Sequence, residues 1–409
     1  MTTRKTLRRI GAGIAGLLAL SACGNFLEVE YPNVVSAEDV DPLADATTLS
    51  VSALQDLASS YGTYAVFGGI FTGELYSADV NSGGNLMSVR QVDETATNGY
   101  FASMSRARVL ATKVLSSLDG TPGATSVNTA RAWNVSGYAF LSFAEYFCSA
   151  TVDGGPELTT TNLLDSAAAN FTKAVVIGTA LGASGASMKD LALVGRARAH
   201  LAVGRKPLAL ADAQAVSANF RFDLVYINDL TNITRLGNLI WHQFFNIGNA
   251  AVAPPFQNLT DPRVQTTSPS VNRLRPMDGV TDMWSINKFN SYAAPIRLAS
   301  KLEADYVAAE AQGTTAMLAL VGARRSANAQ PAYTGATDDA SVLVEFLRQK
   351  TLDFYVEGKR MGDYRRYPTQ LPFLVPAGTT YRKPNVPPYG NGRCWPLPIQ
   401  ERTNNPNLR

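Results

Sequence analysis

The sequence has very little of the chemistry that catalytic and metal sites require. Its 409 residues include two histidines, His200 and His242, and three cysteines. C-x-x-C, H-E-x-x-H and EF-hand spacings are missing, as are a G-x-S-x-G nucleophile motif and a phosphate-binding Walker A loop. We therefore expect no catalytic residue, no metal site and no cofactor.

The sequence also lacks a charge excess and a long apolar run. Hydrophobic residues make up 46% and charged residues 17%, which is typical of a globular protein with a real core. Arg4, Lys5, Arg8 and Arg9 precede an apolar stretch at 10–20, and without these four cations 32 basic residues face 33 acidic ones. A nearly neutral chain lacks the basic surface that nucleic acids require, so we expect no nucleic-acid partner. The apolar stretch is too short for a membrane span, which takes about 20 residues.

The N-terminal segment has the pattern of a secretory signal followed by a lipidation site. A basic start, a short apolar stretch and small residues before a cleavage point define such signals, and residues 1–22 fit this pattern. Leu20-Ser21-Ala22-Cys23 resembles the bacterial lipobox, whose cysteine becomes the lipidated first residue of the mature protein. Several acyl chains on Cys23 would hold the protein on a membrane, since each buried methylene contributes about 0.8 kcal/mol. A plain signal peptide with a chance cysteine is the alternative.

The two remaining cysteines are Cys148 and Cys394. In an exported protein, such a pair favours a single disulfide, which would join the middle of the chain to its C-terminal end. Two separate buried thiols are the alternative, and the spacing does not decide between them.

The middle of the chain has the clearest helical periodicity. After a helix at about 98–118, the pattern predicts helical segments at 131–147, 164–181, 189–203 and 207–218. In the segment 189–203, large apolar residues and small residues lie on different faces, so this helix can pack against neighbours on both sides. The region of about 98–218 therefore resembles tetratricopeptide-like helical hairpins, although no strict 34-residue repeat is visible.

The remaining segments are less regular. We expect an irregular tether at 25–45, a helix at 43–64, a glycine-rich stretch at 68–84, helices at 295–312 and 339–366, and an extended tail from 368. Proline, asparagine and aromatic residues dominate from about 221 to 292. Long loops on a rigid scaffold often carry binding sites, so we expect the ligand region here, within a single domain of residues 23–409 whose C-terminal part is 295–409.

Aromatic residues in or beside the irregular regions are the candidates for ligand binding. A sugar has apolar ring faces edged with hydroxyls, so a flat aromatic surface with amide and guanidinium donors beside it suits such a ligand. The candidate ligand-binding residues are Tyr76, Asp79, Trp241, Asn272, Arg273, Trp284 and Tyr292. A place in the core is the alternative for each aromatic residue.

Several short motifs occur in a fixed order along nearly the whole chain. They include Cys-Gly-Asn-Phe-Leu-Glu at 23–28, Ser-Ala-Asp at 77–79, Asp-Pro-Arg at 261–263, Ala-Ala-Glu-Ala at 308–311 and Pro-Leu-Pro at 396–398. The strongest is Glu-Gly-Lys-Arg-Met-Gly-Asp-Tyr-Arg-Arg-Tyr at 357–367. In this set the chain resembles the SusD/RagB family of surface nutrient-binding lipoproteins, whose pattern at the last motif is Glu-Gly-x-Arg-x-x-Asp-Leu-x-Arg-aromatic.

We expect the motif at 357–367 to support the fold rather than to contact a ligand. Gly358 can adopt the positive φ that closes a helix. Glu357, Arg360, Asp363 and Arg366 lie three residues apart, so opposite charges can pair on one helix face.

The resemblance implies a mostly α fold, with tetratricopeptide-like hairpins and long irregular loops, and a binding role without catalysis. Such a protein would be anchored by its lipid on the outer face of the outer membrane, over a SusC-like TonB-dependent porin. There it would capture an oligosaccharide or another small nutrient for import. A helical-repeat scaffold for envelope assembly and a surface glycan hydrolase, whose two acids would lie far apart in sequence, are the alternatives.

Overall fold

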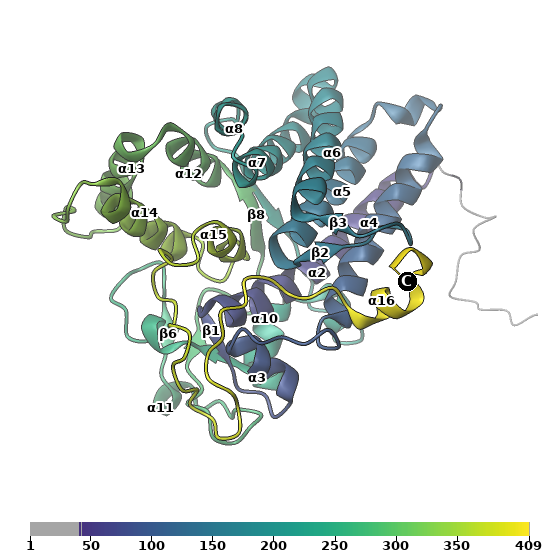
Figure 1. Cartoon of the computed structure of the whole chain (residues 1–409). Helices are drawn as coiled ribbons and strands as arrows, with labels where there is room; N and C mark the ends of the chain where they lie inside the picture. Colours follow the sequence, from purple (N-terminus) through teal and green to yellow (C-terminus); the bar gives the residue numbers. More distant parts are fainter. Residues whose placement is uncertain (1–40, 42, 409) are drawn as a thin grey trace, which may run out of the picture. The chain divides into compact units, whose positions relative to one another are not determined.

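The computed structural model describes residues 41 and 43–408 of the chain. The expected signal peptide, the lipid anchor Cys23 and nearly all of the expected tether lie outside the described residues. Contacts divide the chain into two units, Met1–Asp41 and Pro42–Arg409, and the second unit is the one described below. It is mostly helical, with a few short strands, so the predicted fold class is confirmed (Figure 1). In the described part of the chain, no helix is both long enough and apolar enough to cross a membrane.

The predicted array of helical hairpins forms the upper part of Figure 1. Each helix packs against the next one along the chain. Its members are α4 (Asn98–Leu118), α5 (Val127–Tyr146), α6 (Thr160–Ala180), α7 (Ala186–Ala202) and α8 (Lys206–Gln214). Local sequence fixes their starts: the Ser126 hydroxyl accepts from the Thr129 N–H, and Thr159 and Asn162 form a capping box at the start of α6.

Small residues bring the hairpin helices close together. Phe171 of α6 is fully buried between Gly137 of α5 and Gly195 of α7. A Cβ atom on Gly137 would lie 2.6 Å from this ring, and one on Gly195 would overlap it. The ring of Tyr138 also meets Phe171 edge to face, with the centroids 5.0 Å apart. The small face of the helix predicted at 189–203 is therefore a contact surface for its neighbours.

The central helix α2 (Ala46–Thr72) packs against α4, α5 and α10. It is longer than the predicted helix at 43–64 and continues through Gly68 and Gly69. Gly68 lies against the ring of Tyr146, so this glycine serves a close packing contact rather than a loop. The helix ends at Gly73, whose φ of 79° is the left-handed conformation typical of a helix end.

The described strands form four two-stranded antiparallel sheets. The pairs are β1 (Leu75–Ser77) with β5 (Ala250–Val252), β2 (Ser149–Ala150) with β3 (Leu158–Thr159), β4 (Arg221–Leu224) with β8 (Ile296–Ser300), and β6 (Thr266–Thr267) with β7 (Ser285–Ile286). Strand β8 corrects the expected helix at 295–312, because its residues pair with β4 and α12 (Lys301–Gln312) begins only after Ser300.

The C-terminal helices also differ from the expected ones. Helix α13 (Thr314–Ala327) was not predicted, and the expected helix at 339–366 is divided into α14 (Asp339–Asp353) and α15 (Arg360–Arg366). The break follows from left-handed backbone at Val356 and Gly358, with φ of 53° and 71°. The other short helical elements are α3 (Ser82–Ser88), η1 (Pro122–Ala124), η2 (Gly182–Gly185), α9 (Ile233–Leu236), α10 (Leu239–Trp241), η3 (His242–Ile247), η4 (Pro254–Phe256), α11 (Pro269–Asn272), α16 (Ile399–Asn404) and η5 (Pro406–Leu408).

A disulfide joins the end of α5 to the C-terminal tail. Cys148 and Cys394 are bonded, with their Cα atoms 5.1 Å apart. The neighbouring residues Phe147 and Trp395 form a parallel bridge, and the Trp395 N–H donates to the Tyr146 carbonyl at 2.7 Å. Trp395 is fully buried, so the tail carries part of the core although it forms little regular structure.

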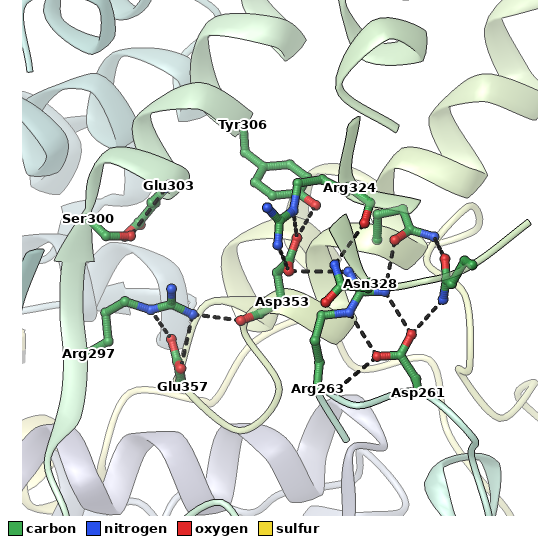
Figure 2. A network of polar contacts seen from close by, with 12 residues as sticks. Asp261, Arg263, Arg297, Ser300, Glu303, Tyr306, Arg324, Asn328, Asp353 and Glu357 are labelled. Atoms are coloured by element: carbon green, nitrogen blue, oxygen red, sulfur yellow. Dashed lines mark hydrogen bonds and ion pairs between the residues drawn. The ribbon is translucent and has the colours of Figure 1, made fainter. Parts of the chain in front are cut away.

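The motif at 357–367 lies inside this framework. Glu357 pairs with Arg297 of β8 at 2.8 Å (Figure 2). It also pairs with Lys288 at 2.6 Å, and not with Arg360 as expected. Although burial opposes its charge, these two cations hold the pKa of Glu357 below its usual range. Of the expected pairs, Asp363 and Arg366 do meet, at 2.6 Å.

Among the residues that the structure describes, Arg360 has only neutral hydrogen-bond acceptors. Its guanidinium donates to the Thr72 and Pro372 carbonyls and to the Thr351 hydroxyl. The Arg360 side chain therefore joins the end of α2 to α14 and to the tail.

A second ionic network fixes the remaining C-terminal helices (Figure 2). The carboxylate of Asp353 accepts hydrogen bonds from Arg324 of α13 at 2.7 Å and from the Tyr306 hydroxyl of α12 at 2.6 Å, and it pairs with Arg263 at 3.2 Å. Arg263 in turn pairs with Asp261 at 2.8 Å. The Asp-Pro-Arg motif at 261–263 is thus part of the scaffold.

Candidate ligand-binding site

The candidate ligand-binding residues lie in two groups. Trp241 and Tyr292 come together on one partly exposed surface, with a ring-centroid distance of 4.2 Å. The other candidates lie around the β1–β5 and β6–β7 sheets, where they mainly serve the fold. We call Trp241, Phe245 and Tyr292, with His242 and Asn246, the aromatic cluster.

Two consecutive helical elements position the aromatic cluster. Asn238 caps the start of helix α10, because its side-chain oxygen accepts hydrogen bonds from the N–H groups of Ile240 and Trp241. The chain continues as the π-helix η3, which ends at Gly248 with a φ of 74°. Single π-helical turns are rare and often occur at functional sites. This one carries Phe245 and Asn246 on the same surface as Trp241.

The rings of the cluster form a stepped apolar surface. Trp241 and Phe245 are stacked, with their centroids 5.3 Å apart and their planes at 22°. Tyr292 is inclined to Trp241 at 57°. All three side chains are half-buried, so each ring is held by packing and still meets solvent.

Polar groups border this apolar surface. The Tyr292 hydroxyl lies 3.0 Å from Nδ1 of His242, and the amide of Asn246 lies 3.3 Å from the same nitrogen. Burial lowers the pKa of His242 and raises the pKa of Tyr292, so at neutral pH the imidazole is uncharged and the phenol is protonated. The rim therefore offers neutral hydrogen-bonding groups, and Asn246 is exposed.

The loop that carries Tyr292 is fastened to the start of α10. The Asn238 N–H donates to the Tyr292 carbonyl at 2.7 Å, and its side-chain amide donates to the Ala294 carbonyl at 2.6 Å. Gly237 lies directly under the Tyr292 ring, where a Cβ atom would be 2.9 Å from Cδ1. These contacts fix the position of Tyr292 beside Trp241 before any ligand arrives.

Tyr76 is not the exposed platform that its place beside a glycine-rich stretch suggested. It is 6% exposed, because β1 pairs with β5 and its hydroxyl donates to the Asp282 carbonyl at 2.9 Å. The Arg382 guanidinium lies over its ring at 4.2 Å from the centroid. Burial, the largest cause, raises the pKa of Tyr76 to about 12. Phe289, an aromatic residue of the loop-rich region at 221–292, is buried as well.

The other predicted residues hold loops in place. The Asn272 amide donates to the carbonyls of Thr267 and Met283, and the Asp79 carboxylate accepts from the Asn81 backbone and side chain. Trp284 is half-buried against the core, and its carbonyl accepts from the Val252 N–H. Arg273 is exposed and has a φ of 54°.

Sequence reasoning missed Phe245, His242 and Asn246 as partners of Trp241. The signal was present, because Trp241 and Phe245 are four residues apart and residues at this spacing share a helix face. The loop expected at 221–292 hides that spacing. In the described part of the chain, no group of three or more His, Cys, Asp or Glu residues is arranged to hold a metal ion.

Comparison with known proteins gives structural matches only. No family model matches the chain, and no curated protein matches its sequence. A surface glycan-binding protein from Bacteroides uniformis is 13% identical with a TM-score of 0.68, over 90% of this chain and 98% of that one. A laminarin-binding SusD-like protein is 15% identical with a TM-score of 0.66, over 88% and 96% of the two chains. A chitin-binding SusD homologue from Flavobacterium johnsoniae is 15% identical with a TM-score of 0.63, over 82% and 88%.

Proposed function

We propose that this chain, which has the SusD-like fold that its motifs predicted, binds a glycan at the cell surface through the aromatic cluster. The observation that carries the proposal is the stacked pair of Trp241 and Phe245 beside Tyr292, half-exposed and bordered by neutral polar groups. Three proteins with the same fold are described as binding glycan, laminarin or chitin. These matches support the ligand class, and the residues of this chain support the place.

The chemistry of the cluster suits an uncharged sugar. The C–H groups on one face of a pyranose pack on an aromatic ring, while its hydroxyls reach the edge of that ring. The Asn246 amide can both donate and accept there. A stepped set of rings favours two or more sugar units over a single one, since adjacent units of a chain also lie at an angle.

We propose further that residues 1–22 are removed and that the mature domain, residues 23–409, is held by lipid on Cys23 at the outer face of the outer membrane. A SusC-like TonB-dependent porin would receive the ligand. The lipobox and the ordered family motifs support this part. Co-purification from detergent-solubilised outer membranes tests it. Recovery of acylated protein with a large β-barrel protein is expected, whereas an unacylated N-terminus or a protein recovered alone would contradict it.

Replacing Trp241 with alanine tests the site. Aromatic anchors at the centre of a binding surface contribute about 2 kcal/mol or more, so we expect the affinity for a bound glycan to fall roughly thirtyfold. A panel of neutral glycans is first screened by affinity electrophoresis, and the Kd of the tightest ligand is then measured by calorimetry.

Trp133 of α5 provides the matched control, because it is also a half-buried tryptophan, and the Lys173 ammonium lies over its ring at 4.0 Å from the centroid. Trp133→Ala should bind like the wild type. Equal losses in both variants, or no loss in Trp241→Ala, would contradict the proposed site. Sustained release of sugar products by the wild type would favour the alternative function of a surface glycan hydrolase. Cells with the Trp241→Ala protein that take up glycan normally but lose envelope integrity would favour the alternative function of a scaffold for envelope assembly.

A further inference from the structure

A cavity of about 220 Å³ lies away from the aromatic cluster. Its walls come from the ends of the hairpin helices α5, α6 and α7 on one side and from α12, α14 and α15 on the other. The volume is smaller than that of typical drug-sized sites, which span about 300–1,000 Å³. It suits a guest of a few heavy atoms.

The walls of this cavity carry more positive than negative charge. Three carboxylates line it, from Glu145, Glu303 and Asp363. The cations that line it are Arg198, Lys350, Lys359, Arg365 and Arg366. Part of the excess is balanced just outside the lining, where Arg366 also pairs with the Glu310 carboxylate.

On the α7 side of the cavity, the positive charges are balanced by carboxylates of the cavity wall. Arg198 pairs with Glu145 at 2.6 Å and with Glu303 at 3.1 Å. Lys359 pairs with Glu303 at 3.3 Å. On the α15 side, Lys350 binds Asp363 at 2.7 Å. Each of these cations has a carboxylate within ion-pair distance.

Arg365 is the exception. Its guanidinium donates to two neutral acceptors, the Phe147 carbonyl and, at 2.7 Å, the Thr160 hydroxyl. Within the described residues, no carboxylate lies within ion-pair distance of it. Burial lowers the pKa of Arg365 against the opposing influence of the more distant Glu145 carboxylate, so the charge of this guanidinium is incompletely balanced.

We propose that the cavity binds a small carboxylate whose charge balances that of Arg365. A guanidinium presents parallel N–H donors that match the two oxygens of a carboxylate, which makes arginine the usual partner for this group. Arg365 and Thr160 are half-buried, whereas the side chains of Glu303 and Lys359 at the opposite wall are 3% exposed, so a guest would meet Arg365 first. The walls join the hairpin array to the C-terminal helices, so an occupied cavity would stabilise the whole fold.

Calorimetric titration of the purified protein with sodium acetate tests this proposal. Sodium chloride of equal ionic strength serves as the blank, and sodium phosphate distinguishes carboxylates from other oxyanions. The wild type should bind acetate saturably, and its Tm should rise with acetate more than with chloride. Loss of a charged hydrogen-bond partner weakens binding about tenfold or more, so this loss is expected in Arg365→Gln. Arg365→Lys should fall between the two.

Two further variants keep the test decisive. Arg221→Gln removes the same charge from an exposed site on β4 and should leave acetate binding unchanged. Ala202→Leu fills the cavity and leaves every charged group in place, so it should also abolish binding, even if Arg365→Gln does not fold. The proposal is overturned by the absence of saturable acetate binding in the wild type, by equal binding in Ala202→Leu, or by binding of phosphate alone.

Discussion

Glu74, between α2 and β1, offers a test of how burial sets the pH dependence of stability. The side chain is 1% exposed. Its Oε1 accepts from the Val356 N–H at 2.9 Å, in the link between α14 and α15. Burial is the largest influence and raises the pKa of Glu74 from 4.5 to about 7, although Arg360, the Val356 N–H and Lys288 lower it.

The sign follows from comparing the folded and unfolded chains. The folded chain holds the Glu74 proton more tightly than the unfolded chain does, so this proton adds to the free energy of unfolding. The added stability is complete below the pKa of the unfolded chain and is lost as pH rises through about 7. Each pKa unit corresponds to about 1.4 kcal/mol, so ionising Glu74 lowers the free energy of unfolding by about 3 kcal/mol. Glu74→Gln keeps a similar shape and an acceptor for Val356 but carries no proton to lose.

Urea denaturation of the wild type and of Glu74→Gln, at about pH 4.5 and about pH 8, measures this contribution. We expect the stability of the variant relative to the wild type to increase by about 3 kcal/mol between the two pH values. Other ionisable groups, including both histidines, are common to the two proteins and cancel in the comparison. Glu157→Gln, at an exposed glutamate, is the control. A change below about 1 kcal/mol for Glu74→Gln would refute the reasoning.

Two further predictions concern packing and the covalent link. Gly195→Ala should destabilise the protein by about 1–3 kcal/mol because the added Cβ would overlap the Phe171 ring. Gly322→Ala, at a helical site with open space, should be neutral or slightly stabilising. Chemical denaturation of both variants measures the difference in their free energies of unfolding. Replacing Cys148 and Cys394 with alanine frees a loop of 246 residues and should lower the free energy of unfolding by roughly 3–5 kcal/mol; a difference near zero would show that the tail is held by its packing alone.

The helices of the hairpin array were predictable because their determinants are local. Helix α4 spans the predicted 98–118, and the small and large faces expected at 189–203 are the two packing faces of α7. Helix α13 escaped detection because only Met317 and Val321 of its residues are buried, which leaves a weak apolar pattern. Local periodicity thus predicts helices that bury a full face and misses those that bury little.

Errors elsewhere arose from partners that are distant in sequence. Residues 296–300 form a strand because β4, more than 70 residues earlier, supplies the hydrogen bonds. Glu357 faces Arg297 rather than Arg360, because the helix breaks between residues 354 and 359 and β8 brings a cation from elsewhere. Tyr76 and Trp241 have similar surroundings in sequence, but only Tyr76 is covered, by strand pairing and by Arg382.

The short elements α10 and η3, which carry the rings of the aromatic cluster, are held in turn through contacts with the central helix α2. The Tyr226 hydroxyl donates to the Ala58 carbonyl of α2 at 2.8 Å, and Arg235 pairs with Asp56 of α2 at 3.1 Å. Leu239 packs against Gly62, again on α2. A three-residue helix and one π-helical turn are too short to be stable alone, so these contacts with a 27-residue helix must hold the rings in place.

This anchorage bears on affinity. Rings already fixed in the free protein lose little conformational entropy when a ligand binds, whereas each side chain immobilised on binding costs about 0.5–1.5 kcal/mol. Asp56→Asn, which weakens the contact with Arg235 without touching a ring, should therefore lower glycan affinity by a few-fold while leaving the ring surface chemically intact. Unchanged affinity in Asp56→Asn, together with a large loss in Trp241→Ala, would show that α10 and η3 hold the rings without this ion pair.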